Sequence, residues 1–349
     1  MDLISIDVHG QSRQEQTSAR VRSLIEFWKT RQDKMIEHTV TKPSAEKEQR
    51  VDVTLEDRPE RTPIWIALPV VLDRTLRNTW RQPDIFWTRW TQAPILAICF
   101  FLFFLRLPNG PAGAQDRIGL VAECTSSVAF VGFLNLAALY PMEKTVFFHD
   151  YKSAGGRYSS ATFITAFTIF AIIPEFISAL IFSVIMNVAT GMRTGARIYF
   201  EFAIAVWMQL SFGESIGIAF ASFFDTMGLS VSLVSVFLSV AAQASSVFSA
   251  SIAKFLQDVA WIFPMKYGTR IQLINEMQGM VFNCPPDTIA NGECTAATGQ
   301  QVLDLFGFHD TPWHLVLISI AVTLGYRIAA WAILAIRCVG VLTWIFSYS

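Results

Sequence analysis

Four ionisable side chains stand inside long apolar runs of this sequence, where they could serve chemistry or binding: Glu123, Glu201, Glu214 and Arg327. An ionisable group inside a membrane span is costly, and it is a functional candidate by default. A purely structural role is the alternative for three of them. Glu201 lies near the end of its run, and Arg327 could pair with Glu214.

Glu123 has the clearest pattern of the four. Ser126 and Phe130 follow it at spacings of three and four residues, which places the three side chains on one face of a helix. A carboxylate inside a span needs water, a polar partner or a raised pKa to relieve the cost of burial. This face is therefore the most specific candidate in the sequence for contact with a ligand.

The other residue types predict no active site. The pattern G-x-x-x-x-G-K-[ST], whose backbone holds phosphates in P-loop NTPases, does not occur in the sequence, and neither does an LSGGQ-like signature. We found no credible Ser/His/Asp or paired-carboxylate arrangement. The histidines fall in predicted loops, linkers or span ends: His9, His38, His149, His309 and His314. We expect no catalytic residue, metal or cofactor in this chain, and no ATP hydrolysis by the chain alone.

Membrane-spanning helices are the elements expected to position these residues. Hydrophobic residues make up 52% of the chain and charged residues 16%, and the mean hydropathy is +0.41. Such values are typical of a polytopic membrane protein. The predicted fold class is all-α, with six spans long enough to cross a bilayer. These spans are expected at about residues 87–107, 118–140, 161–189, 196–224, 228–251 and 314–337.

Two further helices are expected beside the spans. Tryptophan and arginine recur along residues 72–90, as in an amphipathic helix at the headgroup boundary, and Pro83 should break that helix. Residues 255–276 are interrupted by Pro264 and Gly268 and carry several charges. We therefore expect this second segment not to cross the membrane.

Charged residues divide the chain into two parts. Residues 1–62 hold 23 of the 55 charged residues, which predicts a cytosolic linker before a membrane domain of residues 63–349. Basic residues in 61–90 and 143–158 place both termini on the cytosolic side by the positive-inside rule, while the particular membrane stays open. No apolar run opens the chain, so no signal peptide is expected. The net charge of −1 argues against a nucleic-acid partner.

Cys284 and Cys294 flank a polar loop within residues 277–312. On the predicted topology this loop faces away from the cytosol. Zinc binding is the weaker interpretation, because no second pair of ligands stands near at the required spacing. We therefore predict a disulfide between these two cysteines.

The polar stretch 143–160 separates two predicted spans. A short hairpin that turns at Gly155-Gly156 is the simplest interpretation. The stretch also resembles the segment E-K…F-x-x-[ED]-Y of ABCG-type ABC transporters, which in that family forms the cytosolic coupling helices that touch the ATPase domain. The residues assigned to coupling by this resemblance are Glu143, Lys144, His149, Asp150, Tyr151, Arg157 and Tyr158.

The resemblance covers nearly the whole chain. Residues 4–28 are similar to the piece that follows the ATPase domain in fungal ABCG members, and residues 264–276 are similar to the family's re-entrant helix before the last span. By this resemblance the chain is an ABC-2 type transmembrane domain of a fungal half-transporter, without its ATPase domain. ATP and Mg²⁺ are then expected on an ATPase domain that acts in cis or in trans.

The resemblance implies an exporter of lipid-like or amphiphilic molecules, working in membrane lipid as a homodimer or as a heterodimer with another half-transporter. Its central cavity would be lined by Glu123, Ser126, Phe130, Gln243 and Ser246, and closed outward by Ser251 and Ile252. Glu123 and Gln243 would make this cavity more polar than is usual in the family, so the substrate stays open. A non-transporting scaffold or pseudo-permease, or a gene fragment of a longer half-transporter, is the alternative.

Overall fold

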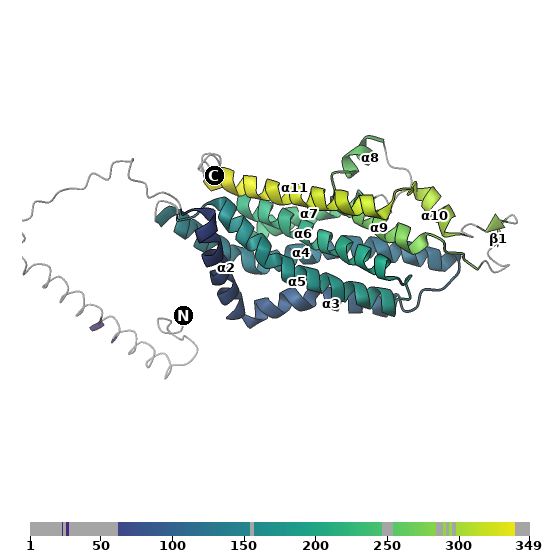
Figure 1. Ribbon diagram of the computed structural model, residues 1–349, viewed down its shortest axis with the longest axis horizontal. Helices are drawn as coiled ribbons and strands as arrows, with labels where there is room; N and C mark the ends of the chain where they lie inside the picture. The colour runs from purple at the N-terminus through teal and green to yellow at the C-terminus, as the bar shows by residue number, and fades with distance from the viewer. Residues whose placement is uncertain are drawn as a thin grey trace, which may run out of the picture. The chain divides into compact units, whose positions relative to one another are not determined.

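The computed structural model describes residues 62–153, 157–245, 254–283, 289–290, 293–294 and 298–338, together with Ser23, Glu26 and Phe27. The chain divides into two units, Met1–Arg58 and Pro59–Ser349, and nearly all described residues belong to the second. Among them, five helices are long and apolar enough to cross a membrane, which confirms an all-α membrane protein. They run side by side in Figure 1 and are α3 (Pro83–Phe103), α4 (Pro111–Ser153), α5 (Ser160–Ala189), α6 (Ala196–Phe223) and α11 (Pro312–Cys338).

A sixth apolar helix, α7 (Met227–Gln243), is shorter than these five, with 17 residues. It begins where the fifth span is predicted, at about residue 228. The predicted end of that span, at 251, lies outside the described residues, as do Ser246, Ser251 and Ile252. Where six spans were predicted, the described residues hold five long helices and one shorter apolar helix.

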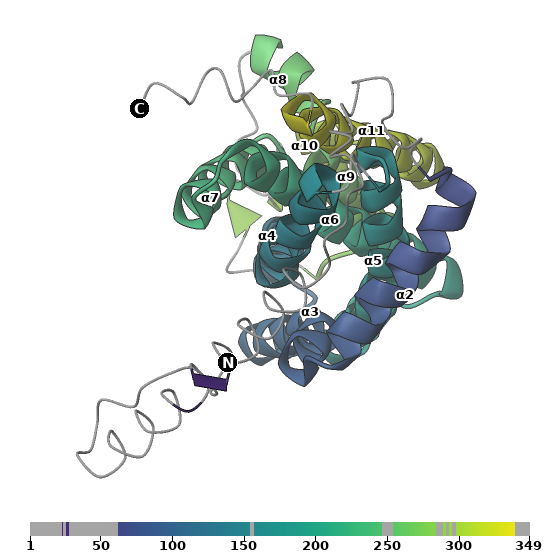
Figure 2. The same cartoon turned by 90° about the vertical axis from the view of Figure 1, so that its left-hand side faces the viewer.

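Helix α6 occupies the centre of the bundle and packs against α4, α5, α7 and α11 (Figure 2). Small residues allow its backbone to approach that of α4 closely. A Cβ atom at Gly132 of α4 would lie 2.0 Å from the carbonyl oxygen of Leu210, and one at Gly213 would lie 1.9 Å from that of Ala129. Glycine is therefore required on both sides of this helix contact.

Helix α4 is longer than the predicted span 118–140, because it continues through Pro141 to Ser153. A polar composition after Tyr140 suggested a hairpin, but the segment keeps a buried face. Phe147 is fully buried, and its ring stacks on that of Phe163 with 4.6 Å between the centroids. Residues 154–156 are not described. Helix α5 then begins at Ser160, after the N-cap residue Ser159, whose hydroxyl accepts a hydrogen bond from the Thr162 backbone N–H.

The amphipathic helix predicted at 72–90 is α2 (Ile64–Trp80). It starts eight residues earlier than predicted, and α3 begins at Pro83, which confirms the break expected there. The exposed side of α2 carries Trp65 and Trp80, while Val71 and Thr75 are buried. Helix α2 lies across one end of the bundle in Figure 1.

The opposite end carries the short elements that precede the last span. They are α8 (Lys254–Ala260), α9 (Pro264–Met277), the paired strands β1 (Ile289–Ala290) and β2 (Glu293–Cys294), and α10 (Gly299–Phe306). With 14 residues α9 is too short to cross a membrane, in agreement with the prediction for 255–276. Cys284 and the side chain of Cys294 lie outside the described residues, so their disulfide stays a prediction.

Candidate functional site

Arg74 of α2 joins the amphipathic helix to the end of α4. Its guanidinium lies 2.8 Å from the carboxylate of Asp150 and 3.6 Å from that of Glu143, and it donates a hydrogen bond to the Tyr158 hydroxyl at 3.2 Å. Asn78, one helical turn further on, donates to Glu143 Oε1 at 2.9 Å. We call Arg74, Asn78, Glu143, Asp150 and Tyr158 the elbow network.

The centre of the elbow network is shielded from solvent. The Glu143 side chain is 1% exposed, and the Tyr158 ring packs 5.8 Å from that of Phe147. Burial raises the pKa of the Tyr158 hydroxyl, so it stays protonated at neutral pH and can act as both donor and acceptor. Polar contacts shielded in this way hold their geometry better than exposed ones.

The other predicted coupling residues divide into two groups. Lys144 faces inward and donates to the carbonyl oxygens of Ala221 and Phe224, at 2.6 and 3.2 Å, where α6 ends. Arg337 of α11 adds a bond to the Ser222 carbonyl oxygen at 2.6 Å. These cations satisfy carbonyl groups that a helix terminus leaves without a partner within the helix.

His149 and Arg157 form the second group, and their side chains are exposed. Arg157 lies 3.9 Å from Asp150, so it borders the elbow network. Tyr151 is half-buried, with its ring 5.6 Å from that of Phe147. The predicted coupling segment therefore presents an inner set that fixes the helices and an outer set that is accessible to a partner.

The predicted cavity face lies on the outer surface of the single chain. Glu123 is exposed, and the Ser127 hydroxyl donates to its carboxylate at 3.5 Å. Ser126 donates to the Ala122 carbonyl oxygen at 2.9 Å, and Phe130 packs into the cluster that α4 shares with α7. Gln243 is exposed at the end of α7, the helix that packs against α4.

Inside the bundle the structure brings together charges from four helices. The pairing predicted for Arg327 and Glu214 is confirmed at 3.0 Å, and Arg89 of α3 pairs with the second oxygen of the same carboxylate. The Ser211 hydroxyl donates to Glu175 of α5 at 3.2 Å. Glu214 is 0% exposed and Arg89 3%, so this buried charge cluster lies in the core.

Sequence reasoning missed Arg89 and Glu175 as members of the buried charge cluster. Arg89 lies within the segment 72–90, which the sequence predicts as an amphipathic helix at the headgroup boundary, and no pattern singles it out. Glu175 lies within the predicted span 161–189 and was not among the four ionisable candidates. Counting the charges inside the predicted spans could have found Arg89. Acidic groups in spans need basic partners, so the two carboxylates Glu214 and Glu175 imply a second arginine besides Arg327.

Glu201 has a structural role near the start of α6. It accepts hydrogen bonds from Arg197 and from Asn275 of α9, each at 2.8 Å. Nearby, Glu276 of α9 lies 3.3 Å from Arg117, and both side chains are 2% exposed. These contacts hold the short α9 among the long helices, which agrees with the structural alternative for Glu201.

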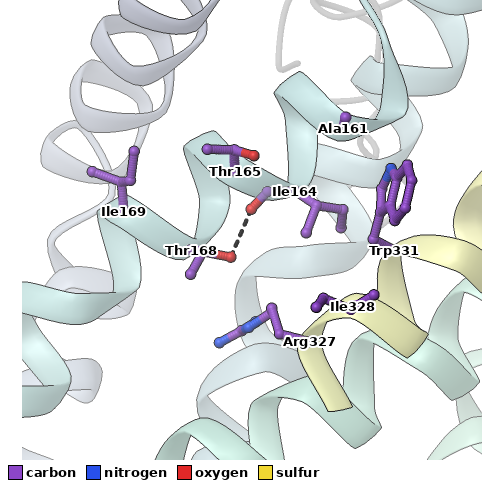
Figure 3. Close-up of a pocket in the computed structure, with 8 residues that line it drawn as sticks. All are labelled: Ala161, Ile164, Thr165, Thr168, Ile169, Arg327, Ile328 and Trp331. Carbon is purple, nitrogen blue, oxygen red and sulfur yellow. Dashed lines mark hydrogen bonds between the residues drawn. The ribbon is translucent and has the colours of Figure 1, made fainter. Parts of the chain in front are cut away.

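A pocket of about 340 Å³ lies between α5 and α11 (Figure 3). Apolar side chains from both helices line it, together with Thr165, Thr168 and Arg327. The Thr168 hydroxyl is used within its own helix, because it donates to the Ile164 carbonyl oxygen at 2.7 Å (Figure 3). The pocket thus brings an apolar groove next to one arginine of the buried charge cluster.

Comparison with protein families gives a match to the ABC-2 type transporter over residues 67–277. That range covers more than half of the chain and runs from α2 to the end of α9, so it includes the elbow network.

Curated relatives agree with the family match. The chain is 26% identical to the uncharacterized ABC transporter ATP-binding protein/permease YOL075C of Saccharomyces cerevisiae, over 96% of this chain and 26% of that protein. It is 23% identical to ATP-binding cassette sub-family G member 5 of Homo sapiens, over 87% of this chain and 48% of that protein.

A third relative is the broad substrate specificity ATP-binding cassette transporter ABCG2 of Bos taurus. It is 24% identical over 69% of this chain and 37% of that protein. The chain thus spans between about a quarter and a half of the length of these three relatives. The chain belongs to the ABC-2 type transporter family, as a transmembrane domain of the ABCG type.

Proposed function

We propose that this chain is the permease of an ATP-driven ABCG-type exporter of lipid-like or amphiphilic small molecules. The elbow network is the observation that carries the proposal. It ties α2 to the end of α4 through Arg74 and Asn78, so that a force on the exposed His149 and Arg157 would move both helices together. A segment that only connected two spans would not need buried polar contacts to a third helix.

In this proposal an ATPase domain, in cis or in trans, binds ATP and Mg²⁺ and presses on the exposed part of the coupling segment. The bundle then moves as a rigid body, as in hinge and shear transitions of other proteins. Two bundles, identical or different, would enclose the substrate path between them. ATP hydrolysis would occur on the ATPase domain and not on this chain.

The proposed substrate path follows Glu123, Ser126 and Phe130 of α4 and Gln243 of α7, together with Ser246. Support comes from the exposure of Glu123 and Gln243 on the single chain, because a carboxylate on this helix would face lipid unless a second subunit covered it. Ser251 and Ile252 would close the path outward. Both termini of the membrane domain are proposed to face the cytosol.

Arg74→Ala tests this function in a fusion of the chain to the ATPase domain of an ABCG relative. The change removes the centre of the elbow network, and we expect substrate-stimulated, vanadate-sensitive ATP hydrolysis to fall by roughly 5- to 30-fold for about 1–2 kcal/mol of lost contact. Arg77→Ala is the matched control, because Arg77 lies on the same helix and pairs only at the surface with Asp73.

Basal hydrolysis separates a loss of coupling from a loss of the ATPase domain's own activity in this experiment. It should persist in Arg74→Ala, since the ATPase domain is unchanged, and the Arg77→Ala fusion should behave like the parent. Equal stimulation in Arg74→Ala and the parent fusion would show that the elbow network does not carry coupling. No stimulation of the parent by any amphiphile would instead favour a scaffold.

A further inference from the structure

A pocket of about 250 Å³ is lined by α2, α3 and α5. Figure 2 shows α2 crossing over the other two helices, with which it is in contact. Its walls are almost entirely apolar and rich in aromatic rings. Leu76 and Trp80 come from α2, Phe86 and Trp90 from α3, and Phe170 and Ile173 from α5. We call it the elbow pocket.

Two polar side chains also line the elbow pocket, and both are buried. Arg89 of α3 is 3% exposed and Thr79 of α2 is 2% exposed. The Nη2 atom of Arg89 donates to Glu214, but its Nε and Nη1 atoms have no hydrogen-bond partner among the described residues. Thr79 Oγ1 has none there either. Buried polar groups without partners are rare and costly, and each one calls for an explanation.

Hydrogen bonds among the described residues do not account for these groups. Glu214 accepts a hydrogen bond from one nitrogen of Arg89. The centres of the Phe167 and Phe170 rings lie 5.7 and 5.2 Å from the guanidinium carbon of Arg89, and these cation–π contacts form no hydrogen bond. The N–H groups at Nε and Nη1 of Arg89 therefore have no acceptor among the described residues.

The Thr79 hydroxyl differs from the hydroxyls of three other threonines. Thr88, Thr91 and Thr145 each donate to the carbonyl oxygen four residues earlier, which is the usual way to satisfy a hydroxyl inside a helix. The hydroxyl of Thr79 makes no such bond. Valine would fill the same space without leaving a polar atom unpaired.

We propose that the elbow pocket binds a single-chain lipid carboxylate, with the apolar chain against the aromatic walls and the carboxylate oxygens accepting hydrogen bonds from Arg89 and Thr79. A guanidinium has donors only and carries a positive charge, so an anionic acceptor complements it best. Glu214 is shared by Arg89 and Arg327, and Glu175 belongs to the same cluster, but Arg89 Nε and Nη1 donate no described hydrogen bond to either carboxylate.

The size and setting of the pocket match this ligand. A volume of about 250 Å³ lies just below the usual range for drug-sized ligands, so it can hold part of one chain but not a two-chain lipid. Leu76 and Trp80 of the pocket wall are also exposed on α2, as on amphipathic helices that lie at a membrane surface. A lipid could therefore enter from the bilayer. The site is separate from the proposed path along Glu123, and it does not depend on transport.

Photolabelling of the purified full chain in phosphatidylcholine nanodiscs tests the site directly. The probe is a sixteen-carbon carboxylate with a diazirine in its chain, and the comparison probe is the matching alcohol. Labelled peptides are identified by mass spectrometry. We expect the carboxylate to label the peptides of α2, α3 and α5 that line the pocket, at least tenfold more strongly than the alcohol, because a hydrogen bond to a charged group changes binding by about that factor.

Two substitutions leave the buried charge cluster intact. Thr79→Val removes one donor and should weaken labelling by about tenfold. Leu76→Trp should fill the pocket and abolish labelling, whereas Val70→Trp places the same ring on an exposed position of the same helix and should leave labelling unchanged. Thermal unfolding of each variant confirms that it is folded.

Equal labelling by the carboxylate and the alcohol would overturn the proposal. Labelling that is unchanged in either Thr79→Val or Leu76→Trp would also overturn it. No ATPase domain and no substrate take part in the measurement, so its outcome is independent of the proposed export activity.

Discussion

Glu214 is the residue on which two arginines of the core converge. Replacing it by glutamine keeps the shape but leaves Arg89 and Arg327 without their shared countercharge. A buried pair broken on one side loses about 3–5 kcal/mol, so we predict a large fall in the thermal unfolding temperature of Glu214→Gln in detergent. Asp225→Asn is the control, because Asp225 is mostly exposed where it pairs with Arg337 and its loss should cost less than about 1 kcal/mol.

A second prediction at this scale concerns Glu123, which we propose selects substrates along the proposed path. If it faces a second subunit, Glu123→Leu should change which of neutral, cationic and anionic amphiphiles a fused transporter exports, with little loss of surface expression. Lipid exposure of Glu123 predicts the opposite: an unchanged export profile and a higher unfolding temperature, since an ionisable group is removed from hydrocarbon. Export assays and thermal unfolding on the two forms therefore separate the two orientations.

Among the elements, the contact between α4 and α6 depends on glycine. A methyl group at Gly132 would overlap the carbonyl of Leu210, and the helices would have to separate, so Gly132→Ala should destabilise the protein by about 1–3 kcal/mol. Gly119 lies on the same helix and has open space around it. Gly119→Ala should therefore be neutral or stabilise by up to about 1 kcal/mol, by helix propensity alone. Equal unfolding temperatures for the two variants would contradict this account of the packing.

The same elements show how far the sequence could predict the structure. Long apolar runs predict α3, α5, α6 and α11, and Pro83 predicts the break between α2 and α3. The length of α4 was not predicted, because Glu143 and Asp150 resemble loop residues until their partner Arg74, some seventy residues away, is known. A polar composition ends a helix only where no neighbouring element supplies partners.

For the whole molecule, the fold class and the membrane location follow from composition, while the buried charge cluster does not. Arg89 and Glu214 are 125 residues apart, and no local pattern links them. No local sequence pattern predicts the elbow pocket either, since its walls come from three helices. The pairing of Arg327 with Glu214 could be predicted from the sequence because each of them stands out as a charged residue in an apolar run.

The orientation of the whole molecule gives a further prediction. We expect the loop 277–312 to face away from the cytosol and Cys284 to be joined to Cys294. A thiol reagent that cannot cross membranes should then label these two cysteines in intact cells only after reduction, whereas Cys338, at the far end of α11, should stay unlabelled. Failure to label either loop cysteine after reduction would place the loop on the other side.

Helix α4 has 43 residues, which at 1.5 Å per residue is a rod about 65 Å long, roughly twice the thickness of the hydrocarbon layer. Asp150 and Glu123 sit on this one rod, about 40 Å apart along its axis. In the proposed coupling it would act as a lever arm, since a tilt of about 5° about one residue displaces the other by about 3.5 Å over that length. Pro141 supplies no backbone N–H and is the natural joint of the lever. The stiffness of α4, and of its backbone at Pro141, would then determine how much of a movement at Asp150 reaches Glu123.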